Sequence, residues 1–318
     1  MRNKKRIIVT GGAGFIGTHI VYRFLREGYK IVVLDNLSTG KKINLPNDAE
    51  FIRFSIERER DYDKLRYMCC DAVFHLAAQS SGEASFSDPY YDFRSHVLGT
   101  FLLLEWCRSR KVRRFIYSSS MSVYGAPRYL PVDEAHPLQP KTYYAAGKAA
   151  AENYINLYNN MFGMHTTILR LFSVYGPGQN FDNKIQGMLS IYLSYLLEGA
   201  PIVVKGSGKR FRDFIYIDDL VEAWWRAFYK PITFGKTYNV ASGKMTTVLK
   251  LLKLLQSACA FNKYPIRFKR GTPGDQFGIV GDAAMLYRDL RWKPAVNVKI
   301  GIQETVDFEK RRLGIEES

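Results

Sequence analysis

Two residues that could do proton chemistry stand four positions apart, Tyr144 and Lys148. On a helix this spacing places both side chains on one face, one turn apart. The lysine ammonium would favour the phenolate and so lower the tyrosine pKa, which is about 10 for a free side chain. Such a tyrosine could exchange a proton with a substrate hydroxyl. The same spacing is common on solvated helix faces, so the pair predicts chemistry only where other residues bring a ligand to it.

A glycine-rich turn near the N-terminus predicts such a ligand. A short β-branched run, 6–10, leads into Gly11-Gly-Ala-Gly14-Phe-Ile-Gly17, and an amphipathic run follows to about residue 27. Strand, glycine turn and helix in this order form the context of a dinucleotide fingerprint. Gly11 permits the tight turn, Gly14 lets the backbone approach a pyrophosphate, and Gly17 permits close packing of helix on strand. The helix N-terminus offers N–H groups to the phosphates.

An acidic residue at the end of the next expected strand indicates which dinucleotide binds. Asp35 closes the run 30–35 and lies 18 residues after Gly17. A carboxylate there accepts hydrogen bonds from the adenosine ribose hydroxyls and repels a 2′-phosphate. The sequence therefore favours NAD over NADP. The alternative is that Asp35 merely caps a turn.

The elements that must position these residues alternate between strand and helix. Further strands are expected at 50–55, 72–78, 113–120 and 165–171, with helices at 93–110 and 142–162. This alternation predicts an α/β protein with a Rossmann-type, doubly wound parallel sheet. Ligands bind such sheets at the carboxyl ends of the strands, so Gly11, Asp35, Ala77 and Ser120 should surround one crevice.

The second half of the chain departs from this alternation. We expect helices at 184–198, from 218 onward and at 248–260, and strands at 201–204 and 214–217. We interpret residues 1–172 as the NAD-binding domain and residues 173–318 as mainly a smaller α/β substrate-binding lobe. Segments near 214–240 are expected to return to the first domain.

The composition bounds the class of protein. The 318 residues are 47% apolar and 14% aromatic, enough for a sizeable core, and carry a formal net charge of +16. That charge is compatible with a proteome-wide bias, with an anionic substrate, or with nucleic acid or a membrane surface. Lys and Arg are scattered, so we favour the first two and expect no nucleic-acid partner. Four cysteines show neither metal-ligand nor disulfide spacing, and the adjacent pair Cys69–Cys70 is expected to end a helix. We expect no metal, no signal segment, no membrane span and a cytoplasmic protein.

The motifs together resemble the extended short-chain dehydrogenase/reductase family, and within it the nucleotide-sugar 4-epimerases acting on UDP-hexoses. The resemblance covers nearly the whole chain. It rests on Gly11–Gly17, Asp35-Asn-Leu-Ser-Thr-Gly40, His75-Leu-Ala-Ala78, Ser118-Ser-Ser-Met-Ser-Val-Tyr-Gly125 and Tyr144-x-x-x-Lys148, and on the later stretches 169–177, 206–216 and 273–275.

The resemblance implies a role for each matching residue. Tyr144 would be the general base for a sugar hydroxyl, Ser120 would hydrogen-bond the same oxygen, and Lys148 would hold the nicotinamide ribose. Residues implied to line NAD are Gly11, Gly14, Phe15, Ile16, Gly17, Asp35, Asn36, Ser38, Gly40, Ile56, Leu76, Ala77, Ala78, His96, Ser118, Tyr144, Lys148 and Phe172. Residues implied to bind the nucleotide sugar are Ser120, Tyr144, Ser173, Arg212, Asp275 and Ile279.

Departures from the family pattern narrow the reaction and raise questions about the substrate. Dehydratases of the family carry Asp-Glu where this chain has Met121 and Ser122, so epimerisation is favoured over loss of water. A reductase or dehydratase of another nucleotide sugar stays the alternative, and a non-catalytic RNA- or partner-binding member is a third. His96 replaces a family Asn, and is expected to be structural or a polar contact to NAD. Ser173 and Thr272 replace an Asn and an Arg that grip the diphosphate.

Other residues carry plainer expectations. Ile279 aligns with a Tyr that narrows the hexose pocket, so it could admit a bulkier sugar. Trp224–Trp225 should be core, Asp218–Asp219 should cap a helix, His75 should be hydrogen-bonded at a strand end, and His136 should be solvated. The resemblance also implies a homodimer through the two long helices at 93–110 and 142–162.

Overall fold

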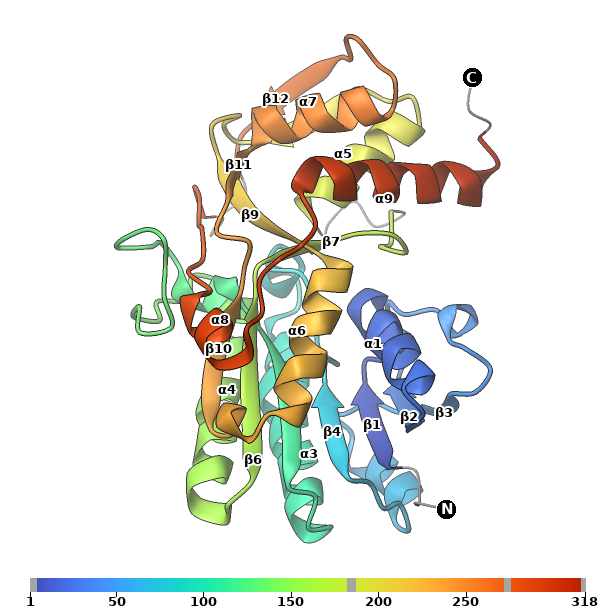
Figure 1. Cartoon of the computed structure of the whole chain (residues 1–318), viewed down its shortest axis with the longest axis vertical. Helices are drawn as coiled ribbons and strands as arrows, with labels where there is room; N and C mark the ends of the chain where they lie inside the picture. The colour runs from blue at the N-terminus through green and yellow to red at the C-terminus, as the bar shows by residue number, and fades with distance from the viewer. Residues whose placement is uncertain (1–4, 182–186, 272–275, 316–318) are drawn as a thin grey trace.

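A seven-stranded parallel sheet forms the base of the molecule (Figure 1). The computed structural model describes residues 5–181, 187–271 and 276–315. The strand order is β10-β6-β5-β4-β1-β2-β3, and every neighbouring pair is parallel. The strands are β1 (Arg6–Thr10), β2 (Lys30–Asp35), β3 (Glu50–Arg53), β4 (Ala72–His75), β5 (Arg114–Ser120), β6 (His165–Leu171) and β10 (Lys236–Val240). The order reverses between β1 and β4, which opens a crevice at their carboxyl ends.

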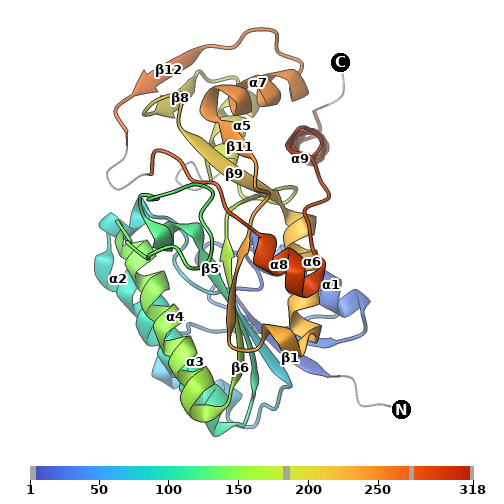
Figure 2. The ribbon, with the colours of Figure 1, turned by 60° about the vertical axis from the view of Figure 1, so that its left-hand side comes forward.

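Helices cover both faces of this sheet, as Figure 2 shows. One face carries α1 (Phe15–Arg26) and α6 (Ile217–Tyr229); the other carries α2 (Pro89–Phe93), α3 (Gly99–Ser109) and α4 (Tyr143–Phe162). Because strand side chains alternate, Ile7 and Val9 pack with the first pair of helices, and Ile8 packs with the second set. The predicted α/β, Rossmann-type doubly wound fold is confirmed.

A smaller lobe lies beyond the carboxyl ends of the strands (Figure 1). It holds a three-stranded sheet of β11 (Met245–Thr247), β9 (Phe211–Tyr216) and β7 (Ser173–Tyr175), and a parallel pair, β12 (Ile266–Lys269) with β8 (Ile202–Lys205). Its helices are α5 (Met188–Leu197), α7 (Val248–Ala258) and α9 (Val298–Leu313), and α8 (Ala284–Leu290) packs near β10. The chain returns from this lobe to the large sheet through α6 and β10.

Short turns of helix complete the described structure. The 3-10 turns are η1 (Lys42–Asn44), η2 (Glu59–Leu65), η3 (Ala84–Phe86), η5 (Met121–Tyr124) and η6 (Pro231–Thr233). A π turn, η4 (Arg94–Leu98), joins α2 to α3. The helix expected at 93–110 therefore begins earlier, at Pro89, and is interrupted. A π turn widens the helix locally and is frequent at functional sites. No helix among the residues in view is long and apolar enough to cross a membrane.

Several expectations about individual residues are confirmed. Trp224 is fully buried, and Trp225 packs partly buried against the same core. The ring of His75 is hydrogen-bonded on both sides, to the Thr10 hydroxyl at 2.8 Å and the Thr100 hydroxyl at 3.0 Å. Because both ring nitrogens have partners, His75 can stay buried without charge.

Three other expectations are wrong. Asp219 does not cap α6, because the N-cap residue of this helix is Tyr216. The Asp219 carboxylate accepts instead from the backbone N–H groups of Ala295 and Val296, at 2.8 and 3.0 Å. His136 is buried rather than solvated, and its Nε2 accepts a hydrogen bond from the Arg128 N–H at 2.9 Å. The pair Cys69–Cys70 lies in irregular chain before β4 rather than at a helix end.

Candidate active site

A cavity of about 580 Å³ lies between the carboxyl ends of the large sheet and the smaller lobe. Most of the residues predicted to bind NAD or substrate line it. These are Gly11, Gly14, Phe15, Ile16, Gly17, Asp35, Asn36, Ser38, Ile56, Leu76, Ala77, Ala78, Ser118, Ser120, Tyr144, Lys148, Phe172, Ser173 and Arg212. Residues that are distant in the chain thus meet at one edge of the sheet, as the parallel strand order requires.

The glycine turn has the shape that a dinucleotide needs. Gly11 adopts a φ of +69°, and a Cβ on it would lie 2.7 Å from the Ala77 nitrogen. A Cβ on Gly17 would lie 2.2 Å from the Gly11 oxygen, so α1 can approach β1 only because residue 17 is glycine. The turn therefore leaves space along its backbone that side chains would fill. These residues fit a dinucleotide cofactor.

Asp35 serves the turn and the cavity together. Its Oδ2 accepts from the Ala13 N–H at 3.0 Å and its Oδ1 from the Leu37 N–H at 2.8 Å. Burial raises the pKa of Asp35, and these two backbone hydrogen bonds oppose the shift. The carboxylate thus ties β2 to the glycine turn, and it still faces the cavity, where its oxygens can accept from hydroxyls.

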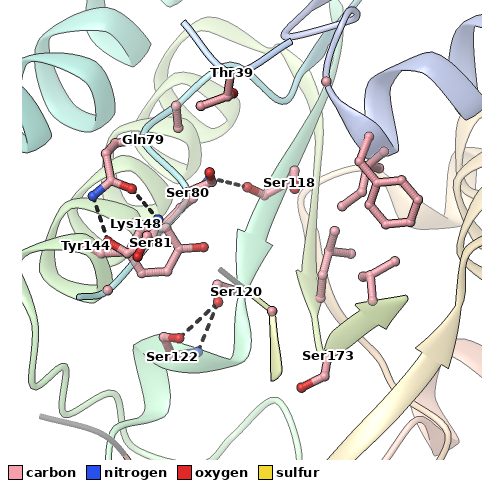
Figure 3. Close-up of a pocket in the computed structure, with 18 of the residues that line it drawn as sticks. Thr39, Gln79, Ser80, Ser81, Ser118, Ser120, Ser122, Tyr144, Lys148 and Ser173 are labelled. Atoms are coloured by element: carbon pink, nitrogen blue, oxygen red, sulfur yellow. Dashed lines mark hydrogen bonds between the residues drawn. The ribbon is translucent and has the colours of Figure 1, made fainter. Parts of the chain in front are cut away.

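Tyr144, Lys148 and Ser120 come together at the ends of α4 and β5 (Figure 3). Helix α4 begins at Tyr143, and the hydroxyl of its N-cap residue Thr142 accepts from the Ala145 N–H at 3.1 Å. Lys148 is buried, and its Nζ donates to the Ser118 carbonyl at 2.6 Å. The Ser120 hydroxyl accepts from the Ser122 N–H at 3.2 Å, where β5 turns into η5.

The pKa values of the two central groups move in opposite directions. Burial raises the pKa of Tyr144, and a hydrogen bond with Ser120 opposes this rise. Burial lowers the pKa of Lys148 to about 7, while the charges of Asp92 and then Glu152 oppose that change. Burial thus outweighs the predicted lowering of the Tyr144 pKa, and the lowering contribution in this structure comes from Ser120. The lowering expected from Lys148 stays a prediction.

Positive side chains from the smaller lobe line the opposite wall. Arg212 is buried, and its Nη1 donates to the Phe211 carbonyl at 2.8 Å. Arg210 also faces the cavity, two residues earlier, as the alternation of an extended chain allows. Lys205 of β8 makes an ion pair with Glu83 at 2.6 Å and so joins the two lobes across the cavity. The sequence analysis missed Arg210, Lys205 and Glu83, although the alternation with Arg212 was a usable signal for Arg210.

Three of the described residues predicted to form the site do not line the cavity. Gly40 packs on Ala13 instead, where a Cβ would lie 2.7 Å from the Ala13 carbonyl carbon. His96 is fully buried behind Tyr144, with ring centroids 5.3 Å apart. Ile279 is fully buried in a cluster with Phe172, so the prediction that it borders the sugar is wrong. Asp275, like Thr272, lies outside the described residues.

No group of three or more His, Cys, Asp or Glu side chains suited to a metal ion occurs within residues 5–181, 187–271 and 276–315. The titratable groups that line the cavity are phenols, ammonium groups, guanidinium groups and a few carboxylates. Such a set can move protons and bind anions.

Comparison with known proteins defines the class. Residues 7–241 match the model of the NAD dependent epimerase/dehydratase family. A putative UDP-glucose 4-epimerase of Methanocaldococcus jannaschii is 36% identical over 96% of this chain and 98% of its own length. The crystal structure of the Thermotoga maritima UDP-glucose 4-epimerase with UDP-glucose superimposes with a TM-score of 0.93 at 34% identity, covering 97% of this chain and 99% of that one.

Further relatives show that the family is chemically mixed. The Thermus thermophilus UDP-glucose 4-epimerase, solved with NAD, has a TM-score of 0.87 at 34% identity, covering 95% of this chain and 98% of that one. A UDP-glucuronic acid decarboxylase of Arabidopsis thaliana is 30% identical over 99% of this chain and 72% of its own length. Fold and site define an NAD-dependent enzyme built on a Rossmann-type sheet. The chain belongs to the NAD dependent epimerase/dehydratase family, within the extended short-chain dehydrogenases/reductases.

Proposed function

We propose that this enzyme inverts carbon 4 of a nucleotide-diphosphate hexose, of the UDP-glucose/UDP-galactose type. One observation carries the proposal: Tyr144, Ser120 and Lys148 share a cavity in which Met121 and Ser122, next to Ser120, supply no ionisable pair. Epimerisation needs one site of proton exchange with the sugar hydroxyl. Elimination of water needs a further acid and base.

The reaction is an oxidation to a 4-keto sugar followed by a reduction on the opposite face. NAD, when bound, supplies the hydride acceptor and donor. Tyr144 takes the proton of the 4-hydroxyl and later returns it, while Ser120 hydrogen-bonds the same oxygen. Lys148 supplies positive charge beside the phenol. Because hydride and proton are both returned, the product has the mass of the substrate.

The positions of the carboxylates that line the cavity argue against a second acid–base pair beside Tyr144. Among the lining residues in the described ranges these carboxylates are Asp35, Glu57 and Glu83. Asp35 is tied to the glycine turn, Glu57 follows the cofactor-lining Ile56, and Glu83 is ion-paired to Lys205. These positions favour cofactor binding and lobe contact as their roles.

The substrate's diphosphate would meet the basic wall of the smaller lobe. Arg212 and Arg210 present guanidinium groups from one stretch of chain, and a guanidinium can bind a phosphate through two parallel hydrogen bonds. Ser173 lines the same cavity. A diphosphate between the lobes would place the attached sugar towards Tyr144, because these walls face each other across the cavity.

An assay of product configuration tests the proposal. The purified enzyme with NAD is incubated separately with UDP-glucose, UDP-galactose and their N-acetyl forms, and products are separated and identified by NMR and mass spectrometry. We expect interconversion of one such pair at unchanged mass. A product that has lost water or carbon dioxide would select a dehydratase or decarboxylase, and no conversion of any nucleotide sugar by NAD-loaded enzyme would reject the proposal.

A further inference from the structure

A buried pair of side chains stands directly behind the proposed catalytic tyrosine. Asp92 lies in the short helix α2 and His96 in the π turn η4, and they are 1% and 0% exposed. The His96 ring meets the Tyr144 ring edge-on at 5.3 Å and 80°. Helix α4 passes so closely that a Cβ on Gly147 would lie 2.8 Å from the His96 Cβ. The pair is therefore held against the segment that carries Tyr144 and Lys148.

The polar atoms of this pair lack ordinary partners. Both carboxylate oxygens of Asp92 and both ring nitrogens of His96 are buried without a hydrogen bond to any described residue. The shortest contact between them, His96 Nε2 to Asp92 Oδ1, is 3.6 Å, just too long for a hydrogen bond. A buried polar group without a hydrogen bond destabilises the folded state, so its presence calls for a physical reason.

The charge on Lys148 supplies that reason. Lys148 is buried, and the carboxylates that raise its pKa are Asp92 first and Glu152 second. Glu152 is already neutralised by the buried Arg170, whose Nη2 lies 2.7 Å from its Oε2. Asp92 has no ion pair in the described structure except the long contact to His96. Asp92 is thus the carboxylate left to balance the ammonium.

The other groups around the pair carry no competing charge. From β4, His75 is held neutral, because burial lowers its pKa to about 3. From β5, burial raises the pKa of Tyr117, so its phenol stays protonated. Burial first, and then the charge of Lys148, lowers the pKa of His96, so its ring is neutral as well. Tyr144 and Lys148 face the pair from α4.

We propose that Asp92, steadied by a neutral His96, is the counter-charge that keeps the Lys148 ammonium protonated beside Tyr144. Both would be positioning residues, since they act through Lys148 and do not line the cavity. Burial raises the pKa of Asp92 to about 6. Asp92 is therefore charged in the pH range in which Lys148 titrates, and the Lys148 pKa of about 7 already includes the raising effect of the Asp92 charge. The catalytic meaning of this pair rests on the proposed function, whereas its electrostatic effect does not.

The titration of Lys148 can be followed without any substrate. The full-length enzyme is labelled with [ε-¹³C]lysine, the Lys148 signal is assigned with Lys148→Met, and its chemical shift is recorded against pH. In the Asp92→Asn variant we expect the Lys148 midpoint to fall by on the order of one pH unit. Asp88→Asn is the matched control, because it is the same substitution at the N-cap of the same helix, where the side chain is exposed to solvent. Asn also caps helices well, so this variant should keep the helix intact. Equal midpoints in the two variants would overturn the proposal.

Two further measurements keep the proposal testable if Asp92→Asn does not fold. In the wild-type enzyme the Lys148 titration should show a second inflection near pH 6, where Asp92 titrates. A single-step curve would overturn the proposal. His96→Asn, which keeps an N–H donor, should retain the wild-type midpoint, whereas His96→Leu should lower it. Equal midpoints in these two variants would reject the role given to His96.

The assay of product configuration separates this inference from the proposed function. If the enzyme epimerises no nucleotide sugar but the Lys148 midpoint moves in Asp92→Asn, the proposed function fails and the inference stands. If the enzyme epimerises normally and the midpoint does not move, the inference fails alone. When both hold, the alkaline limb of the pH–kcat profile should shift with the Lys148 midpoint.

Discussion

Two adjacent tyrosines at the start of α4 have different surroundings. Tyr144 faces the cavity and the Ser120 hydroxyl, whereas Tyr143 is 51% exposed. Proton transfer by a positioned side chain contributes roughly 10²–10⁴-fold to a rate. We therefore expect Tyr144→Phe to lower kcat by about that factor while the protein keeps its NAD. Tyr143→Phe, the same change one residue away, should leave kcat within about twofold. Initial rates and cofactor content measure both, and equal losses in the two variants would contradict the assignment.

His75 gives the fold a defined sensitivity to acid. Its pKa is about 3 in the folded protein, against a usual value of 6.5. Between these values the unfolded chain binds a proton that the folded protein does not, so stability falls as pH decreases through this window, by about 1.4 kcal/mol per unit. In His75→Asn this contribution should be absent. Asp92, with its raised pKa, contributes with the opposite sign in both proteins, so it cancels in the comparison.

Urea unfolding at pH 7, 6 and 5 measures this effect. We expect the wild-type free energy of unfolding to fall more steeply with acidification than that of His75→Asn. Parallel dependences on pH would show that His75 is protonated in the folded state.

At the scale of one element, the turn between β1 and α1 contains glycines with different tasks. A Cβ on Gly17 would lie 2.2 Å from the Gly11 oxygen, but one on Gly14 would lie 3.3 Å from the same atom. Gly17→Ala should therefore force α1 away from β1 and cost on the order of 1–3 kcal/mol of stability. Gly14→Ala should cost less than about 1 kcal/mol and act mainly on NAD affinity. Thermal unfolding and NAD titration separate the two, and equal stability losses would contradict this division of tasks.

The sequence predicted the first half of the molecule well because its signals are local. The β-branched strands, the glycine turn and the spacing of Tyr144 and Lys148 each depend on a few neighbouring residues. Parallel strand order then brought Gly11, Asp35, Ala77 and Ser120 to one edge without further information.

The smaller lobe was predicted less well because its contacts are long-range. Strands β7, β11 and β12 have three or four residues each, too few to show alternation. Asp219 accepts hydrogen bonds from backbone groups 76 and 77 residues away, and no local sequence pattern predicts such contacts. Ile279 was misplaced because a local match to the family said nothing of the cluster that encloses it. Lys205 and Glu83 form one feature of the cavity although 122 residues separate them.

At the scale of the whole molecule, apolar side chains gather on the outer face of α3 and α4. Leu157 and Met161 are 49% and 68% exposed, and Phe101 of α3 packs against Tyr154 of α4 with ring centroids 5.9 Å apart. Exposed apolar side chains that gather on one face of a protein indicate an interface. We propose that this face joins two copies of the chain in a homodimer.

Leu157→Glu should therefore shift the protein from dimer to monomer, because a carboxylate would be buried at the interface without a partner. Ile300→Glu is the matched control, since Ile300 is 56% exposed on α9, in the other lobe. Light scattering coupled to size-exclusion chromatography gives the mass of each variant. A monomeric wild type, or a dimer that both substitutions leave intact, would reject the proposed face.

The chain returns to the large sheet, through α6 and β10, only after it has formed part of the smaller lobe. This order limits how the enzyme can be re-engineered. Strand β10 pairs with β6 along its whole length, and α6 covers the same sheet, yet both come after β7, α5, β8 and β9 of the smaller lobe. A chain cut after residue 172 would leave β6 as an open sheet edge, prone to aggregation. The smaller lobe is therefore built from two separate stretches of chain, one before α6 and one after β10, with α6 and β10 of the large domain between them. Grafting a relative's smaller lobe onto this scaffold requires moving both stretches together.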